Sequence, residues 1–276
     1  NVEEMKLRAA TRGSPLALWQ TNYVAALLQP LGIEVEPLII KTFGDQDQSS
    51  PLHTIGGQGV FVKEVQHAVL DKRANFAVHS LKDLPSLPVE GLSLVSVPKR
   101  GDPSDALVGC RLEDLPTNAN IATGSVRRKA QLSALRPDLN FHELRGNIET
   151  RLAKVKNFDA IIMASVALKR LNLNPGIIDI LEPNVMIPQV GQGAIGLECL
   201  TGDKELQGAL EQIEDYKSRE LVGATFLGDR TYCYIDIKDG ELYVKGDISV
   251  YGNEWFATGD NVAVNSNGEF YYYGRI

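Results

Sequence analysis

Cysteine, histidine and long apolar runs are all scarce in this chain of 276 residues. Its three cysteines, Cys110, Cys199 and Cys233, are odd in number and widely spaced, which excludes a disulfide framework and a CxxC metal motif. The four histidines show no ligand spacing, so no metal site is expected. No apolar stretch approaches the roughly 20 residues that cross a bilayer, and the polar segment 1–4 does not resemble a signal peptide. We therefore expect a cytoplasmic protein with no membrane contact.

An excess of positive charge is also absent, because 28 Lys and Arg face 35 Asp and Glu, for a formal net charge of −7. This balance argues against general binding to nucleic acid. A local basic cluster in such a chain is expected to be a focused site for a small acidic ligand. The length and the 43% hydrophobic content are sufficient for two or three domains, each with its own core.

Apolar runs alternate with helical periodicity up to about residue 216, which predicts an α/β fold with largely parallel sheets. Strands are predicted at 5–10, 34–41, 76–80, 121–123 and 159–163. One helix is expected to begin at Ser14-Pro15, and another to follow the glycines at 56–59 and end near residue 70. A linker is predicted at 98–103.

The composition changes after about residue 216. Of the 19 Phe, Trp and Tyr residues, 11 lie between Phe226 and Tyr273, within a β-like pattern. Asp239-Gly240 and Asn267-Gly268 are favourable hairpin turns. Residues 217–276 are therefore expected to form a separate, small, mainly β module with an antiparallel sheet.

A cluster of cations stands where a helix should disfavour it. Ser125 is a predicted N-cap, which places Arg127, Arg128 and Lys129 in the first turn, beside the positive end of the helix dipole. The cluster is either a solvated basic turn or part of an anion site. Arg12 and Arg145 occupy similar strand-to-helix junctions, just before the predicted N-caps Ser14 and Asn147. Ligands bind at such junctions in open α/β sheets. Three such junctions favour one anionic ligand in a cleft between two domains.

Three further basic side chains and one carboxylate are candidates for the same cleft. Arg151 and Arg170 lie on predicted helices, where solvated helix charge is the competing interpretation. Lys82 and Asp83 lie just past the end of the strand at 76–80. Asp83 should stay ionised among arginines and could stabilise a cation or move a proton; the alternative is a turn carboxylate before Pro85. The glycines at 56–59 are either a lid hinge or a phosphate loop, and we expect His79 to be buried in its strand.

Together these motifs resemble hydroxymethylbilane synthase, also called porphobilinogen deaminase. The matching segments are TRGSPLAL (11–18), KTFGD (41–45), GGQGVFVKE (56–64), VHSLKDLP (78–85), RGN (145–147), TRL (150–152) and VGQGAIG (190–196). They follow the order of the family over roughly the first 215 residues. Several long motifs in one order make the resemblance specific.

The resemblance implies an enzyme that joins four porphobilinogen molecules head to tail, with release of ammonia, on a dipyrromethane cofactor attached to a cysteine. It implies that Asp83 is the catalytic carboxylate and that Phe61 belongs to a lid. The side chains implied to bind carboxylates of the cofactor and the linear pyrrole chain are Arg12, Ser80, Lys82, Thr123, Ser125, Arg127, Arg128, Arg145, Arg151 and Arg170. We also expect a monomer that binds no nucleic acid.

The implied fold has two domains like those of periplasmic binding proteins, at 1–98 with 194–216 and at 99–193, and a third domain at 217–276. The third domain departs from the family pattern. Cys233 matches the cofactor-bearing cysteine in one alignment, whereas the segment 221–225 in another leaves Thr225 at that place. Segments 254–260 and 268–276 are weakly similar to adenylate-forming enzymes. Two hypotheses stay open: a hydroxymethylbilane synthase with an atypical third domain, and a non-catalytic protein that binds carboxylates in an arginine cleft.

Overall fold

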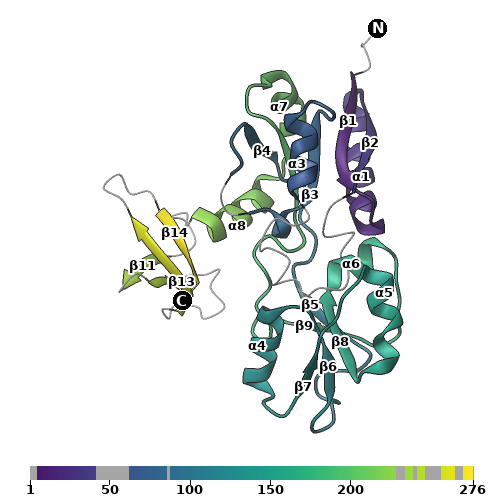
Figure 1. The fold of residues 1–276 in the computed structure, drawn as a ribbon, viewed down its shortest axis with the longest axis vertical. Coiled ribbons are helices and arrows are strands. Elements are labelled where there is room, and N and C mark those ends of the chain that lie inside the picture. The colour runs from purple at the N-terminus through teal and green to yellow at the C-terminus, as the bar shows by residue number, and fades with distance from the viewer. Residues whose placement is uncertain are drawn as a thin grey trace. The chain divides into compact units, whose positions relative to one another are not determined.

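The computed structural model describes residues 5–41, 62–85, 88–227, 234–238, 241–245, 256–264 and 270–275, and from residue 222 onward it describes only the helix and strand bounds. The chain divides into two compact units, 1–219 and 220–276. The first unit holds two five-stranded sheets, here called sheet A and sheet B, and the layers of helix around each form lobe A and lobe B (Figure 1).

Sheet A has the strand order β2-β1-β3-β10-β4. Its strands are β1 (Met5–Arg12), β2 (Ile33–Ile40), β3 (Phe76–Ser80), β4 (Leu92–Ser96) and β10 (Ile195–Leu200). Strand β1 runs parallel to β2 and β3, whereas β10 lies antiparallel between β3 and β4. The first four residues of β3 are all buried, which is typical of a strand covered on both faces.

Helices cover both faces of sheet A. On one face α1 (Pro15–Leu28) and α7 (Lys204–Glu211) pack on a core that includes Val24, Phe76 and Leu210. On the other face α3 (Lys63–Leu70) packs through Val65 and Val69. A fully buried side chain of this size contributes roughly 1.5–3 kcal/mol, so these two cores fix the position of the strand ends in lobe A.

Sheet B has the strand order β7-β6-β8-β5-β9. Its strands are β5 (Asp105–Val108), β6 (Asn120–Ala122), β7 (Asn140–His142), β8 (Ala160–Ala164) and β9 (Ile178–Leu181). The helices of lobe B are α4 (Val126–Leu135), α5 (Ile148–Ala153) and α6 (Ser165–Arg170). The central strand β8 is buried along its whole length and contributes to a core on each face of the sheet.

The chain passes from one lobe to the other twice, near Gly101 and near Gly193, and these two crossings contact each other. The backbone N–H of Gly101 donates to the Gly193 carbonyl at 3.0 Å. Gly193 has φ +84°, and a Cβ there would lie 2.6 Å from the Gly101 carbonyl oxygen. Only glycine satisfies both constraints, so the contact between the two crossings requires this residue.

The predicted strands and the two predicted helices are confirmed, and residues 97–104 form the expected linker without regular structure. Four of the five strands in each sheet share one direction, as the sequence predicts, whereas one strand, β10 in sheet A and β5 in sheet B, runs antiparallel to both of its neighbours. The reason is the crossing of the chain. Strands β5 and β10 each follow a crossing from the other lobe. Each therefore begins on the side of its sheet where the carboxyl ends of the other strands lie, and it runs in the opposite direction to them.

The second unit contains most of α8 (Tyr216–Leu227) and one antiparallel sheet in the order β11-β12-β13-β14. Its strands are β11 (Tyr234–Lys238), β12 (Glu241–Lys245), β13 (Phe256–Val264) and β14 (Phe270–Arg275). The predicted antiparallel sheet is present in the described strands, whereas the predicted turns at Asp239-Gly240 and Asn267-Gly268 lie outside the described residues. Among the described residues of either unit, no helix has the length and apolar character needed to cross a bilayer.

Candidate functional site

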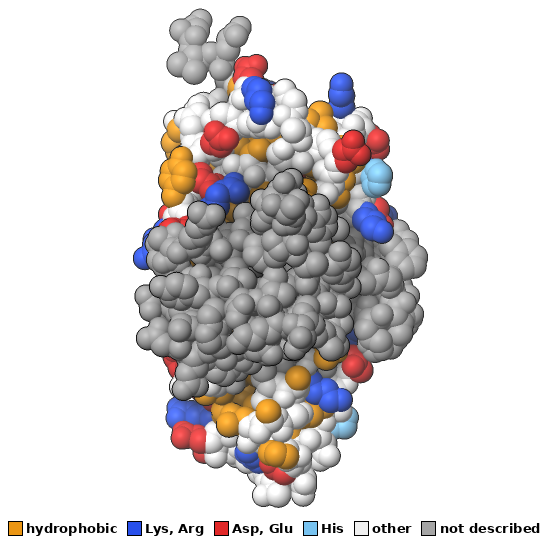
Figure 2. Space-filling view, turned by 90° about the vertical axis from the view of Figure 1, so that its left-hand side faces the viewer, with side chains coloured by type: hydrophobic (Ala, Val, Ile, Leu, Met, Phe, Trp, Pro, Cys, Tyr) orange, Lys and Arg blue, Asp and Glu red, His pale blue; other side chains and the backbone are white. Residues whose placement is uncertain are grey.

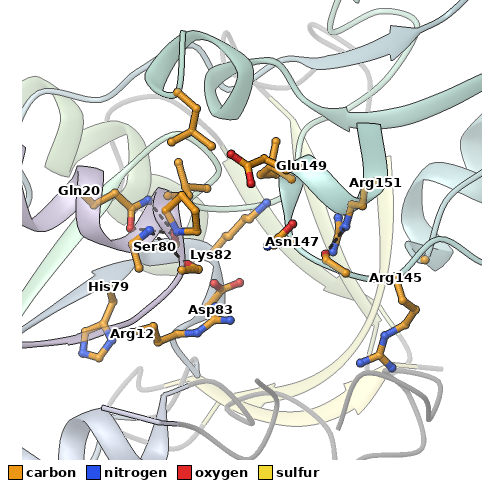
Figure 3. Close-up of a pocket in the computed structure, with 18 of the residues that line it drawn as sticks. Arg12, Gln20, His79, Ser80, Lys82, Asp83, Arg145, Asn147, Glu149 and Arg151 are labelled. Carbon is orange, nitrogen blue, oxygen red and sulfur yellow. Dashed lines mark hydrogen bonds between the residues drawn. The ribbon is translucent and has the colours of Figure 1, made fainter. Parts of the chain in front are cut away.

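A cavity of about 330 Å³ lies between lobe A and lobe B (Figure 3). Its lining brings together the ends of several strands and the starts of the helices that follow them. Among the lining residues are five cations and two carboxylates: Arg12, Lys82, Arg128, Arg145, Arg151, Asp83 and Glu149. A cavity with this excess of positive charge, in a chain of net charge −7, is suited to a ligand that carries several negative charges.

On the described part of the face in Figure 2, Lys and Arg are interspersed with Asp and Glu. Exposed opposite charges also pair with each other, as in Lys6 and Glu34, whose charged atoms lie 3.0 Å apart. Exposed pairs of this kind contribute little to stability.

Three of the polar residues that line the cavity are N-caps of helices. Ser14 accepts a hydrogen bond from the Ala17 backbone N–H at 3.3 Å at the start of α1. Ser125 accepts from the Arg128 N–H at 3.4 Å at the start of α4. Asn147 accepts from the Thr150 N–H at 2.8 Å at the start of α5. All three predicted caps are therefore present, and each capping residue also lines the cavity.

Lys82 and Asp83 lie in a single turn, Leu81–Asp83, directly after β3. Leu81 is buried and its N–H donates to the Ala194 carbonyl at 3.0 Å, which fixes the turn against the second crossing. This anchoring leaves Lys82 and Asp83 to line the cavity, and Figure 3 shows Asp83 projecting into it. The turn therefore presents a carboxylate and an ammonium side by side in the sequence at one wall.

The cavity perturbs two of its cations. Burial, and then the neighbouring Arg128, lower the pKa of Lys82 from 10.5 to about 8. Burial, followed by the charges of Arg128 and Arg145, lowers the pKa of Arg151 to about 10. The Nε of Arg151 donates to the Gly146 carbonyl at 2.8 Å. Both side chains remain mainly cationic at neutral pH, under mutual repulsion that an anionic ligand would relieve.

A buried carboxylate of the protein itself, that of Asp105, pairs with the basic turn at the start of α4. Arg127 Nη2 lies 2.7 Å from Asp105 Oδ2, and Arg128 Nη2 lies 2.8 Å from Asp105 Oδ1. Arg127 also donates to the Ile187 carbonyl, and it is not among the residues that line the cavity. The anion that the sequence analysis required is thus supplied in part by a buried side chain rather than wholly by a ligand.

A second cavity of about 70 Å³ adjoins the same wall, since Lys82, Arg128 and Arg151 line both. Arg170 lines this smaller cavity. Its guanidinium lies 5.1 Å from the centre of the Trp19 ring, and its Nη2 donates to the Gly193 carbonyl at 2.7 Å. Arg170 therefore links α6 to α1 and to the crossing between the lobes.

The remaining residues predicted for the site are Ser80, Thr123, Phe61 and Cys233. Ser80 lines both cavities, and its Oγ accepts a hydrogen bond from Gln20 Nε2 at 2.8 Å. Thr123 is buried, and its Oγ1 accepts from the Ser125 N–H at 3.1 Å. Phe61 and Cys233 lie outside the described residues. Among the described residues, no three His, Cys, Asp or Glu side chains are grouped to hold a metal ion.

His79 is buried in β3, as predicted, lines the cavity and contacts Glu198 of β10. Its Nε2 lies 3.0 Å from Glu198 Oε2, which also accepts from Gln66 Nε2 at 2.8 Å. Burial alone would raise the pKa of Glu198, but these two partners lower it below its ordinary value. The pair therefore joins strands β3 and β10.

Sequence analysis did not single out Asp105, Gln192 or Gln20, all of which are buried around the cavity. Asp105 begins the apolar strand β5, and a carboxylate before such a run was the available signal. Gln192 lies inside VGQGAIG (190–196), a segment that carries the family resemblance but does not indicate a role for this residue. Gln20 gave no signal, since its role follows from the packing of α1 beside β3.

Comparison with known proteins gives three findings. Residues 7–208 match the family model described as "Porphobilinogen deaminase, dipyromethane cofactor binding domain". The chain is 47% identical over 265 residues to "Porphobilinogen deaminase, chloroplastic" of Euglena gracilis, with 88% of this chain and 55% of that protein covered. The chain thus spans about half the length of this relative. Residues 1–216 are too few to make up 88% of the chain, so the similarity continues into 217–276.

Solved structures with a similar course of the chain are distant in sequence. A lipoprotein of Clostridium difficile 630, described as putative, is 12% identical with a TM-score of 0.49, over 83% of this chain and 98% of that one. A periplasmic substrate-binding protein of an ABC transporter from Coxiella burnetii is 13% identical with a TM-score of 0.47, over 81% and 97%.

Proposed function

The chain belongs to the porphobilinogen deaminase family, and on that premise we propose that it is a hydroxymethylbilane synthase. In this proposal it joins four porphobilinogen molecules head to tail, with one ammonia released for each, on a covalently attached dipyrromethane primer. The reaction belongs to tetrapyrrole biosynthesis, and the enzyme is a transferase. The activity is a proposal for this chain because the chain spans only part of the Euglena protein.

The charge of the cavity is the observation that carries the proposal. Five cations and two carboxylates line one space of about 330 Å³. Porphobilinogen carries an acetate and a propionate on its pyrrole ring, and dipyrromethane carries two of each. The donor set therefore fits both groups, since guanidinium and ammonium side chains bind carboxylates through charge-assisted hydrogen bonds.

We assign Asp83 the central chemical role. Loss of ammonia from porphobilinogen breaks a carbon–nitrogen bond and leaves a cationic pyrrole; a new carbon–carbon bond then forms and a proton leaves the attacking ring. An ionised carboxylate in the cavity can accept a hydrogen bond from pyrrole N–H groups, stabilise the positive charge and assist the proton's departure. Dipyrromethane, when attached, would supply the nucleophilic carbon from which the chain grows.

The remaining residues are proposed to bind and orient the ligand. Those that line a cavity are proposed to contact its carboxylates directly: Arg12, Ser80, Lys82, Ser125, Arg128, Arg145, Arg151 and Arg170. Arg127 and Thr123 are proposed to act from behind this wall, through Asp105 and Ser125. Phe61 as a lid residue and Cys233 as the cofactor anchor stay predictions outside the described residues.

The proposal extends to the domains. We propose two domains like those of periplasmic binding proteins, at 1–98 with 194–216 and at 99–193, and a small third domain at 217–276. The insertion of β10 into sheet A supports the return of the chain after residue 193. A cytoplasmic location and a monomeric state stay predictions, and the Euglena relative is named a chloroplastic protein.

The experiment uses the full chain supplied with porphobilinogen, with ammonia release and substrate consumption as the two readouts. Intact mass followed by peptide mapping is expected to find a dipyrromethane adduct on Cys233. The variant Cys233→Ser should lack the adduct and the activity, whereas Cys110→Ser should keep both. If the unmodified chain binds porphobilinogen without turnover and cannot be loaded, the proposal fails in favour of the non-catalytic carboxylate-binding protein.

A further inference from the structure

Asp105 is the most heavily hydrogen-bonded carboxylate among the residues that surround the cavity. It begins β5 and is completely buried. Its Oδ2 accepts from Arg127 Nη2 at 2.7 Å. Its Oδ1 accepts from Arg128 Nε at 3.0 Å and Nη2 at 2.8 Å, and from Gln192 Nε2 at 2.8 Å. One carboxylate is thus shared by two guanidinium groups and one amide.

This arrangement fixes how Arg128 faces the cavity. Asp105 occupies the Nε and Nη2 edge of the guanidinium, the edge that would otherwise bind a ligand carboxylate in a forked manner. Nη1 of Arg128 also donates to the Ile162 carbonyl at 3.3 Å. Arg128 therefore presents mainly its charge to the cavity, and Asp105 sets the orientation of its guanidinium group.

Gln192 extends the arrangement from Asp105 to Lys82. Its Nε2 donates to Asp105 and, at 2.6 Å, to the Pro103 carbonyl. Because both acceptors face the Nε2 side of the amide, Oε1 must point the other way. There it accepts from Lys82 Nζ at 3.3 Å and from Arg128 Nη2 at 3.5 Å. A residue of the lobe crossing thus connects a strand of sheet B to the turn that carries Asp83.

We propose that Asp105 is a positioning residue of the candidate site: through Arg128 and Gln192 it holds the cationic wall and Lys82 in the arrangement that receives the ligand. The inference rests on the proposed function for the identity of that ligand. The arrangement itself follows from the contacts of Asp105 and does not depend on the proposed function.

The charge of Lys82 reports on this arrangement. The charged groups that face Lys82 are Asp83 from its own turn, Arg128 from α4, Arg151 from α5 and Asp105 from β5. The two arginines disfavour the ammonium form, and the two carboxylates favour it. Removal of the Asp105 charge leaves the two arginines opposed by Asp83 alone, so Lys82 should lose its proton at a lower pH.

The test measures the acetylation of Lys82 by acetic anhydride as a function of pH on the full chain, quantified by peptide mass spectrometry. The unaltered protein is expected to show a midpoint near pH 8. In Asp105→Asn, which keeps the size of the side chain, the midpoint should fall by roughly one pH unit.

The matched control is Asp138→Asn. Asp138 is also bound to an arginine, with 2.7 Å between Asp138 Oδ2 and Arg136 Nη2, but both side chains are partly exposed and neither residue lines a cavity. Its substitution should leave the Lys82 midpoint in place. A folded Asp105→Asn protein, verified by circular dichroism, with the same Lys82 midpoint as the unaltered chain would overturn the proposal.

Loss of a buried counter-ion can prevent folding, and a second variant covers that outcome. Gln192→Met keeps the length of the side chain and the Asp105 charge but removes the amide that links Asp105 to Lys82. It should lower the Lys82 midpoint by a smaller amount, since a hydrogen bond to the ammonium form is lost; an unchanged midpoint overturns the proposal. A shifted midpoint in a chain that never consumes porphobilinogen refutes the proposed function and leaves the positioning role standing.

Discussion

Replacing Lys82 with methionine should stabilise the free protein at neutral pH, although it removes a residue of the candidate site. Burial and Arg128 lower the pKa of Lys82 from 10.5 to about 8 in the folded chain. The folded state therefore disfavours a proton that the unfolded state keeps. At 1.36 kcal/mol for each pKa unit, the charged ammonium costs about 3 kcal/mol of folding free energy below pH 8.

Methionine has a similar length and carries no charge, so Lys82→Met removes this cost. It also removes the hydrogen bond from Nζ to Gln192, which contributes about 1 kcal/mol. The expected net gain is about 2 kcal/mol in the free energy of unfolding at pH 7. Because a lowered lysine pKa makes stability rise as pH rises from about 8 to 10.5, the gain should shrink by roughly 2 kcal/mol between pH 7 and 9.5.

Urea denaturation of the full chain at 25 °C, followed by circular dichroism at several pH values, measures this difference. Lys129→Met on the exposed side of α4 serves as the matched control, and its effect should be small and constant with pH. A Lys82→Met gain that is absent, or that stays constant up to pH 9.5, would show that the cavity does not strain the ammonium group.

Three more outcomes follow from the site. Asp83→Asn should reduce the rate of porphobilinogen consumption by about 10²–10⁴-fold while calorimetry finds unchanged binding of the substrate; an equal loss of binding would refute the chemical role. Arg151→Leu should weaken substrate binding by roughly tenfold or more, through the loss of a charge-assisted hydrogen bond, and should reduce its dependence on salt, measured by titration at several ionic strengths. Glu198→Gln should cost about 1–3 kcal/mol at pH 7 by removing the charged partner of His79. Since the folded pKa of Glu198 lies below its ordinary value, that contribution is present above about pH 4.5 and is lost as pH falls through the folded pKa, so urea denaturation at lower pH should bring variant and parent together.

Local chemistry was enough to predict most elements of the first unit. Ser14, Ser125 and Asn147 each cap the helix that follows them, as their positions before apolar periodicity indicated. Caps depend on neighbours two or three residues away, so they can be recognised without the fold. The antiparallel course of β10 could not be recognised in this way, because it follows from the return of the chain between lobes.

The candidate site was predictable in composition and only partly in arrangement. Arg12, Lys82, Asp83, Arg145 and Arg151 line the cavity, as the strand-to-helix junctions and the family motifs implied. Arg127 does not, because a carboxylate that lies 22 residues away in the sequence binds it from behind the wall. No local pattern around Arg127 reveals which distant acid will be buried against it.

The sequence by itself determined the α/β elements, the acidic balance, the family and the need for an anion beside the basic turn of α4. These depend on periodicity, caps and motifs that act over a few residues. Only the tertiary structure decided that Asp105 supplies part of that anion, that Gln192 connects it to Lys82, and that Lys82 lies in a place that lowers its pKa. The physical reason is that desolvation and charge pairing depend on which distant segments come to lie within a few ångströms of each other.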